Sequence, residues 1–246
     1  MKALILAAGR GSRMRSYTED RPKGLVEVAG KPLLHRQIDA LKAAGITEVG
    51  VVSGYKAEML KDRGLTLFHN PRWAETNMVT SLSCAEKWLK FEPVLVSYSD
   101  IFYKAEAVSA LMKTPSDIAI TYDPHWQDLW SRRFSDPLSD AETFRFAPNG
   151  QLCEIGTRPT SLDHVQGQYM GLLRFTPAGW ERAMAVRASL KQESCDHLDM
   201  TSLLRILLER GDVIDAIPSP WPWGEVDSEM DLTLYESDPK SFGLSS

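Results

Sequence analysis

The feature that most constrains the fold of this chain is an apolar run at its N-terminus that leads straight into a glycine-containing loop. The run Ala3–Ala8 has the continuous apolar character of a strand buried on both faces of a parallel sheet. Gly9 and Gly11 follow it, and because glycine has no Cβ, the backbone N–H groups of such a loop can approach a polyphosphate closely. Arg13 and Lys23 carry positive charge that can reach the same phosphates. The sequence therefore predicts a phosphate-binding loop at the end of the first strand.

Other phosphate-binding loops match this stretch less well. The dinucleotide motif G-x-G-x-x-G needs a third glycine, and Met14 stands at that position, which disfavours a nicotinamide-dependent dehydrogenase. The Walker A pattern G-x-x-x-x-G-K-[ST] does not occur in the chain. A solvated basic loop without a ligand is the structural alternative, and the added Pro22-Lys23 pair argues against it.

Through residue 123 the chain alternates between apolar runs and segments with helical periodicity. Such alternation predicts βαβ units and an α/β fold with a mainly parallel central sheet flanked by helices. Strands are expected at Ala3–Ala8, Glu48–Ser53, Leu65–His69, Pro93–Tyr98 and Asp117–Tyr122. Helices are expected at Lys31–Ala44, Lys56–Arg63, Met78–Leu89 and Ala105–Met112.

The pattern changes after Pro124. Short stretches at Glu142–Phe146, Leu152–Gly156 and Tyr169–Phe175 predict antiparallel strands inserted into or added to the first sheet. The 246 residues contain no linker-like segment, so we expect one domain. The remaining elements are expected as helices at Pro177–Lys191, Met200–Arg210 and Glu229–Tyr235 and strands at Val213–Ile217 and Trp223–Val226.

Charge and cysteine content narrow the possible partners. The chain has 28 Lys and Arg residues against 33 Asp and Glu residues, a formal net charge of −5, which disfavours non-specific nucleic-acid binding. No apolar run approaches the ~18 residues that a membrane-spanning helix needs. Cys84, Cys153 and Cys195 fit neither a disulfide framework nor a zinc site. We therefore expect a cytoplasmic protein with no nucleic-acid or membrane partner.

Residues 6–13 read Leu-Ala-Ala-Gly-Arg-Gly-Ser-Arg, and Pro22-Lys23 follows them. This combination resembles the nucleotidyltransferase superfamily that makes nucleoside-diphosphate sugars and CDP-alcohols, whose mark is L-A-A-G-x-G-[ST]-R followed by P-K. The resemblance implies a Rossmann-like sheet and transfer of a nucleotidyl group to a phosphorylated acceptor, with release of pyrophosphate. It also implies nucleotide contacts from Leu6, Ala7, Ala8, Gly9, Gly11 and Ser12, and catalytic roles for Arg13 and Lys23, with Lys23 at the α-phosphate or the leaving pyrophosphate.

Two aspartates are placed to hold the metal that such a transfer needs. A phosphate must attack an anionic triphosphate, and a divalent metal together with Lys and Arg neutralises the developing charge. Mg²⁺ prefers oxygen ligands and usually takes one or two protein carboxylates. Asp100 ends the apolar strand VLVSYSD and Asp227 lies in WGEVDSEMD, and both match metal-binding positions of the enzymes that this chain resembles. We expect Mg²⁺ there, with Mn²⁺ as the alternative.

Each aspartate also has a structural alternative, because aspartate is a favoured residue at a helix N-cap. Two neighbouring acidic residues, Glu225 and Asp231, are the less favoured ligands. Asp231 is expected to face solvent from the last helix.

The residues expected to face the base lie at the start of a central helix. In the enzymes that this chain resembles, the base lies over the first strand and against such a segment, which here brings in Tyr55 and the run AETNMVTSLSCA, residues 74–85. Its T-N-M-x-x-S pattern resembles cytidylyltransferases that act on phosphocholine and related phosphorylated amines. Asn77 and Ser81 are expected to hydrogen-bond cytosine or ribose, and the alternative is that Thr76 or Asn77 only caps the helix.

The segment 125–144 is the candidate acceptor site. Aromatic faces attract alkylammonium groups, and arginine binds phosphate or carboxylate through two hydrogen bonds. The alternative is a helix whose aromatic side packs on the core and whose arginines lie in water. With residues 165–175 and 200–209, this region resembles bacterial phosphoglutamine, choline-phosphate and 2-aminoethylphosphonate cytidylyltransferases. The residues expected to contact the acceptor are Trp126, Trp130, Arg132, Arg133, Gln168 and Tyr169. For Gln168 and Tyr169 the alternative is a purely structural role in the sheet.

These expectations combine into one function. We predict metal-dependent transfer of CMP from CTP to a small phosphorylated or phosphonylated metabolite of the phosphoglutamine, phosphocholine or 2-aminoethylphosphonate type, without assigning an oligomeric state. The alternatives are a sugar-1-phosphate or molybdopterin nucleotidyltransferase and a non-catalytic nucleotide-binding regulatory domain. Within one domain of residues 1–246, residues 1–123 are expected mainly to bind nucleotide, 124–175 mainly to bind acceptor, and 176–246 to complete the sheet and metal site.

Overall fold

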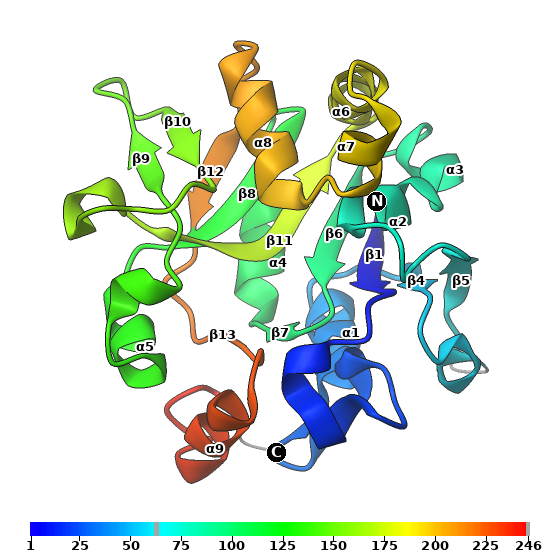
Figure 1. Ribbon diagram of the computed structural model, residues 1–246, viewed down its shortest axis with the longest axis vertical. Coiled ribbons are helices and arrows are strands. Elements are labelled where there is room, and N and C mark those ends of the chain that lie inside the picture. The colour runs from blue at the N-terminus through cyan, green and yellow to red at the C-terminus, as the bar shows by residue number, and fades with distance from the viewer. Residues whose placement is uncertain (62–63, 245–246) are drawn as a thin grey trace.

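A seven-stranded sheet forms the centre of the molecule. The computed structural model describes residues 1–61 and 64–244. Figure 1 shows the central sheet with helices around it. Its strand order is β12-β8-β11-β6-β1-β4-β5. The strands are β1 (Lys2–Ala7), β4 (Val49–Ser53), β5 (Thr66–His69), β6 (Val94–Tyr98), β8 (Ile118–Asp123), β11 (Gln168–Phe175) and β12 (Asp215–Pro218).

Strand β1 lies in the middle of the sheet and contributes to two cores. It pairs in parallel with β4 and with β6. Because side chains alternate along a strand, Ile5 and its neighbours two residues away belong to one core, whereas Leu4 and Leu6 belong to the other. This two-sided burial explains the continuous apolar sequence and confirms the expected mainly parallel sheet flanked by helices.

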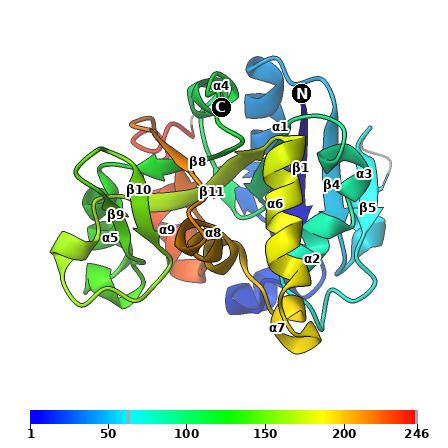
Figure 2. The same cartoon turned by 90° about the horizontal axis from the view of Figure 1, so that it is seen from above.

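Helices cover both faces of the sheet (Figure 2). One core contains the apolar sides of α1 (Leu33–Ala43) and α4 (Ala105–Met112). The other contains those of α2 (Met78–Ser83), α3 (Glu86–Leu89), α6 (Pro177–Ala188) and α8 (Met200–Glu209). Among the described residues, no helix combines the length and the apolar character needed to cross a membrane.

Strand β11 is the antiparallel member of the sheet and lies between β6 and β8. Its register against β8 shifts between Tyr169 and Leu173, and Gly171 in that interval has φ +76°. A bulge of this kind re-aims side chains next to a site. The hairpin β9 (Phe144–Phe146) and β10 (Leu152–Ile155) forms a separate small sheet, so only one of the three expected antiparallel strands joins the central sheet.

The remaining elements lie outside the central sheet. Helix α9 (Glu229–Ser237) begins with a capping box in which Ser228 and Asp231 exchange hydrogen bonds. The 3-10 helices are Ser12–Thr18, Lys23–Leu25, Ala57–Leu60, Pro137–Ser139 and Leu162–His164. The other elements are β2 (Glu27–Val28), β3 (Lys31–Pro32), β7 (Ile101–Phe102), β13 (Gly224–Glu225), α5 (Trp126–Arg133) and α7 (Gln192–Asp196).

The helix expected at 177–191 ends at Ala188, and three expected helices of the first 123 residues differ more from the structure. The helix expected at 78–89 is broken after Ser83, where the side chains of Ser83 and Cys84 both hydrogen-bond to the Thr80 carbonyl and compete with the helical pattern. The helix expected at 31–44 begins at Leu33, because the two residues before it pair in β3. The helix expected at 56–63 is the 3-10 turn 57–60, and residues 62–63 lie outside the described part.

Candidate functional site

The glycine loop after β1 is folded against Lys23. Gly11 has φ +72°, in the left-handed region that favours glycine. A Cβ on Gly11 would lie 2.9 Å from Cδ of Lys23. Glycine therefore serves two purposes here, because it allows the turn and leaves room for the lysine stem across the loop.

Lys23 joins the loop to two strand ends. Its Nζ donates a 2.8 Å hydrogen bond to Asp100 after β6 and forms an ion pair with Asp227 after β13. Only 7% of Lys23 is exposed. Burial alone would lower the pKa of Lys23, but the negative charges of Asp100, Asp227 and Glu225 outweigh it and raise the pKa. Lys23 is therefore held as an ammonium ion among carboxylates.

Arg13 approaches the same site from the solvent side. Its guanidinium forms an ion pair with Asp227, and its side chain is 74% exposed. Burial opposes ionisation of Asp227, but Lys23 and then Arg13 lower its pKa. The site thus has one buried and one exposed cation next to its carboxylates.

The carboxylates include one that the sequence ranked lower. Asp100, Glu225 and Asp227 each offer an oxygen within 4.8 Å of the others. Oδ1 of Asp100 is buried and has no hydrogen-bond partner among the described residues. A set of hard oxygen donors with one oxygen left unsatisfied fits Mg²⁺ or Mn²⁺. Asp227 does not cap a helix, because Ser228 is the N-cap of α9.

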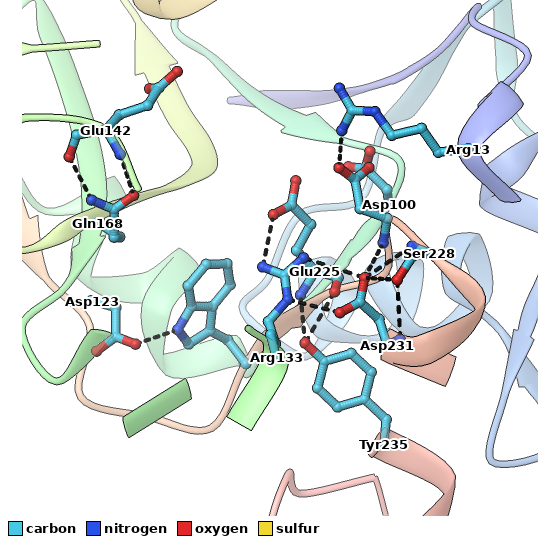
Figure 3. A network of polar contacts seen from close by, with 12 residues as sticks. Arg13, Asp100, Asp123, Arg133, Glu142, Gln168, Glu225, Ser228, Asp231 and Tyr235 are labelled. Atoms are coloured by element: carbon cyan, nitrogen blue, oxygen red, sulfur yellow. Dashed lines mark hydrogen bonds and ion pairs between the residues drawn. The ribbon is translucent and has the colours of Figure 1, made fainter. Parts of the chain in front are cut away.

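A buried network next to this cluster corrects two expectations. The guanidinium of Arg133 donates to both carboxylate oxygens of Asp231, at 2.8 and 3.3 Å, and to Glu225 at 3.2 Å. Asp231 also accepts the backbone N–H groups of Asp227 and Ser228 (Figure 3). Asp231 is thus 3% exposed instead of solvent-facing. Arg133 is paired inside the protein because a buried guanidinium needs carboxylate partners, and it does not reach out to an acceptor.

A cavity of about 330 Å³ opens over the loop and the first strand. Tyr55 was expected to line this cavity, but Trp73 lines it instead. Tyr55 packs edge-to-face against Trp73, with ring centroids 5.3 Å apart. Ala7 points into the core beneath. The predicted nucleotide and catalytic residues that line the cavity are Leu6, Ala8, Gly9, Gly11, Ser12, Arg13, Lys23, Asn77 and Ser81.

Asn77 and Ser81 have partners within the protein. Asn77 is the N-cap of α2, its Oδ1 accepting the N–H of Met78 and its Nδ2 donating to the His197 carbonyl. Ser81 Oγ accepts a hydrogen bond from buried Asn70 at 2.9 Å. The capping alternative therefore holds for Asn77, and its predicted contact with the nucleotide stays a prediction.

A second cavity of about 410 Å³ adjoins the first and shares Arg13, Asp100 and Asp227 with it. Of the expected acceptor residues, Trp130, Gln168 and Tyr169 line it. Further lining residues that sequence reasoning missed are Asp140, Glu142, Asp199, Thr201 and Trp223. Asp140 and Glu142 lie within the segment 125–144 and Thr201 within 200–209, which were predicted as acceptor regions without naming these residues. Asp199 and Trp223 lie outside the predicted segments.

Two other expected acceptor residues lie elsewhere. The indole of Trp126 is 4% exposed and donates to the Val165 carbonyl at 3.0 Å, so it is a core residue. The guanidinium of Arg132 lies 4.2 Å from the ring of Phe242, in a separate hollow behind α5. The structural alternative holds for the inward-packed Trp126 of helix α5. It does not hold for Arg133, which is buried instead of lying in water.

Comparisons with known proteins agree with this geometry. A family model described as "MobA-like NTP transferase domain" matches residues 3–149. A CTP:phosphoglutamine cytidylyltransferase of Campylobacter jejuni is 34% identical over 95% of this chain and 98% of the relative. A UTP–glucose-1-phosphate uridylyltransferase of Haloferax volcanii is 28% identical over 88% of this chain and 87% of the relative. The solved inositol-1-phosphate CTP transferase of T. maritima superposes with a TM-score of 0.76 over 99% of this chain and 94% of that one, at 19% identity.

Proposed function

Because the chain belongs to the family of MobA-like NTP transferase domains and is a nucleotidyltransferase, we propose that it transfers CMP from CTP to a small phosphorylated metabolite. The observation that carries this proposal is the meeting of two cavities at one charged cluster. The phosphate loop and Lys23 line the first, and Asp100 and Asp227 line both. Two anionic substrates can therefore meet beside the cluster.

The similarity to a phosphoglutamine enzyme supports cytosine as the base and an acceptor of amine or amino-acid type. The phosphoglutamine, phosphocholine and 2-aminoethylphosphonate classes are the first to test. The similarity to a uridylyltransferase of glucose 1-phosphate supports a sugar phosphate as the second candidate.

The reaction needs little proton transfer from the protein. An oxygen of the acceptor phosphate attacks the α-phosphorus of CTP. A new P–O bond forms as the bond to the oxygen bridging the β-phosphate breaks, and that oxygen leaves with its electron pair in pyrophosphate. A phosphate monoester is largely ionised at pH 7, so no residue has to act as a base. The site mainly neutralises the charge of the phosphates and aligns the two substrates.

Lys23 and Arg13 are the cations that we assign to the phosphates. The ammonium of Lys23 is held beside the phosphate loop by two carboxylates, and we assign its charge to the α-phosphate or the leaving pyrophosphate. Arg13 is exposed between the two cavities and has the freedom to follow either substrate. We assign to Asp100 and Asp227, with Glu225 beside them, the binding of Mg²⁺ or Mn²⁺. Bound there, the metal neutralises charge on the phosphates that approach it.

A pyrophosphate-release assay with Mg²⁺ tests the proposal. CTP, UTP, GTP, ATP and dTTP are each combined with phosphoglutamine, phosphocholine, 2-aminoethylphosphonate, inositol 1-phosphate or glucose 1-phosphate. We expect turnover with CTP and an aminated acceptor. Turnover with UTP and glucose 1-phosphate would replace the proposal by its second candidate, and absence of turnover with every pair would overturn both.

A further inference from the structure

Carboxylates line the acceptor cavity at both ends. Those at the end shared with the nucleotide cavity are already paired with cations of the protein, Asp100 and Asp227 with Lys23 and Glu225 with Arg133. At the end shared with the nucleotide cavity stands Arg13, its only lining cation among residues 1–61 and 64–244. Asp140, Glu142 and Asp199 contribute carboxylates to the rest of the lining. No described residue forms an ion pair with any of these three. Arg133 and Arg13 act on Asp140 from a distance, but none of the three carboxylates has a described cation in direct contact.

Among these three residues, Glu142 has a fixed backbone and a carboxylate that is available to a ligand. Gln168 fixes its backbone from both sides, accepting the Glu142 N–H at 3.2 Å and donating to its carbonyl at 2.7 Å. The Glu142 carboxylate points away from this amide (Figure 3), and its one described hydrogen bond comes from Thr201 at 3.5 Å. Asp199, by contrast, caps α8 by accepting the N–H of Ser202 at 2.7 Å.

The surroundings of Glu142 favour a positively charged ligand. Burial, followed by the negative charge of Asp199, raises the pKa of Glu142 to about 7. A cation bound at the carboxylate would offset both effects. A buried carboxylate without a partner is unfavourable for the protein alone, and a charged hydrogen-bond donor on a ligand removes that cost.

We propose that the acceptor carries a protonated primary amine at the end opposite its phosphate and that Glu142 binds this ammonium group. The inference rests on the proposed function, because it takes the second cavity as the acceptor site. A primary ammonium has three N–H donors for a carboxylate. A quaternary ammonium has no N–H to donate to a carboxylate and depends on aromatic faces instead. Glu142 is thus a specificity-determining residue for an aminoalkyl phosphate or phosphonate.

The first test compares two acceptors that differ only in the ammonium group. O-phosphoethanolamine and ethyl phosphate are assayed with CTP and Mg²⁺ on the wild-type chain. We expect kcat/KM to be about tenfold or more higher for the amine, the size of a charge-assisted hydrogen bond. Phosphocholine is expected to fall below O-phosphoethanolamine. Equal kcat/KM for the amine and ethyl phosphate, or a preference for phosphocholine, would overturn the inference.

The second test replaces the charge of Glu142. E142Q keeps the shape of the side chain and is expected to reduce the ratio of the two kcat/KM values about tenfold, whereas E142D is expected to retain part of the preference. E181Q, which changes an exposed glutamate on α6, is the matched control and should keep the wild-type ratio. An unchanged ratio in E142Q would overturn the assignment to Glu142. The wild-type comparison decides the acceptor class even where a variant fails to fold.

Calorimetry separates this inference from the proposed function. The same acceptors are titrated into the protein with Mg²⁺ and a non-hydrolysable CTP analogue. Tighter binding of the amine that is lost in E142Q would support the inference even where pyrophosphate release fails, so that only the proposed reaction falls. Equal binding of the two acceptors, or binding of neither at millimolar concentration, would overturn the inference even if another acceptor is turned over.

Discussion

At the scale of single residues, Lys23 has the largest expected effect on catalysis. Its ammonium separates Asp100 from Asp227 and faces the phosphate loop. Lys23→Gln is expected to lower kcat about 10²- to 10³-fold, as removal of a fixed charge donor does elsewhere. Lys113→Gln, on the exposed end of α4, is the matched control. A loss smaller than tenfold in steady-state kinetics would contradict the role given to Lys23.

The same substitution makes a second measurement informative. Without the lysine, Asp100 and Asp227 lose the cation between them, and their mutual repulsion is expected to lower the melting temperature. Added Mg²⁺ should then raise the melting temperature of the variant more than that of the wild type. Equal shifts would argue against a metal at these carboxylates.

Glu142 links acceptor binding to the pH dependence of stability. An unfolded glutamate has a pKa near 4.5, and burial beside Asp199 raises the pKa of Glu142 to about 7 in the folded state. Between these values the folded state binds more protons, so stability falls as the pH rises from 4.5 through 7, by at most about 3 kcal/mol. We expect E142Q to gain stability relative to the wild type between pH 5 and pH 8 in urea unfolding. The same difference in unfolding free energy between E142Q and the wild type at pH 5 and at pH 8 would contradict this.

At the scale of elements, the phosphate loop depends on the close approach of Lys23. Gly11→Ala forces a left-handed residue and a contact with the lysine stem, whereas Gly30→Ala forces the same φ of +72° where nothing lies within 4 Å. Gly30→Ala is expected to lose about 1 kcal/mol of stability, and Gly11→Ala somewhat more because of the added contact. Only Gly11→Ala should lower kcat/KM, by about tenfold, because it displaces Lys23. Equal kcat/KM values in the two variants would show that catalysis does not depend on the position of Lys23.

The contact between α5 and α9 is a buried ion-pair network. Arg133→Met leaves Asp231 and Glu225 without their cation and is expected to cost about 3–5 kcal/mol in urea unfolding. Arg132→Met removes a neighbouring guanidinium that lies over Phe242 and should cost about 1 kcal/mol or less. Because Asp231 holds the backbone of Asp227, the Arg133 variant should also lose activity. Similar stability losses in the two variants would contradict the importance of the network.

At the scale of the whole molecule, the central sheet mixes strands from distant parts of the sequence. Strand β11 separates β6 from β8, so neither the first half nor the second half completes the sheet alone. We therefore predict one calorimetric unfolding transition. CTP with Mg²⁺ at about 100 times its Kd should shift the whole transition upward by roughly 5–10 °C. Two transitions, of which the ligand moves only one, would contradict the expected single domain.

The sequence predicted the parts of the site that follow from local pattern. Lys23 and Asp100 stand at a motif and at a strand end, and both positions depend on neighbours in the chain. Trp73 could not be found in this way, and Glu142 was covered only as part of the segment 125–144. The cavities that they line form only when distant elements meet. Arg133 was misjudged for a related reason, since its partner Asp231 lies 98 residues away. Charge compensation over such a separation leaves no local signal.

The position of β11 also affects how the chain folds while it is being made. Strands β6 and β8 are complete by Asp123, but their shared neighbour is not, because residues 124–167 come before β11. At 5–20 residues per second, synthesis of that stretch takes roughly two to nine seconds on the ribosome. During this time the facing edges of β6 and β8 have unpaired backbone groups, which are a template for strand pairing with other chains. A pause in translation after β8 has left the ribosome but before β11 has done so should therefore promote aggregation of the nascent chain. A pause after β11 has emerged should not.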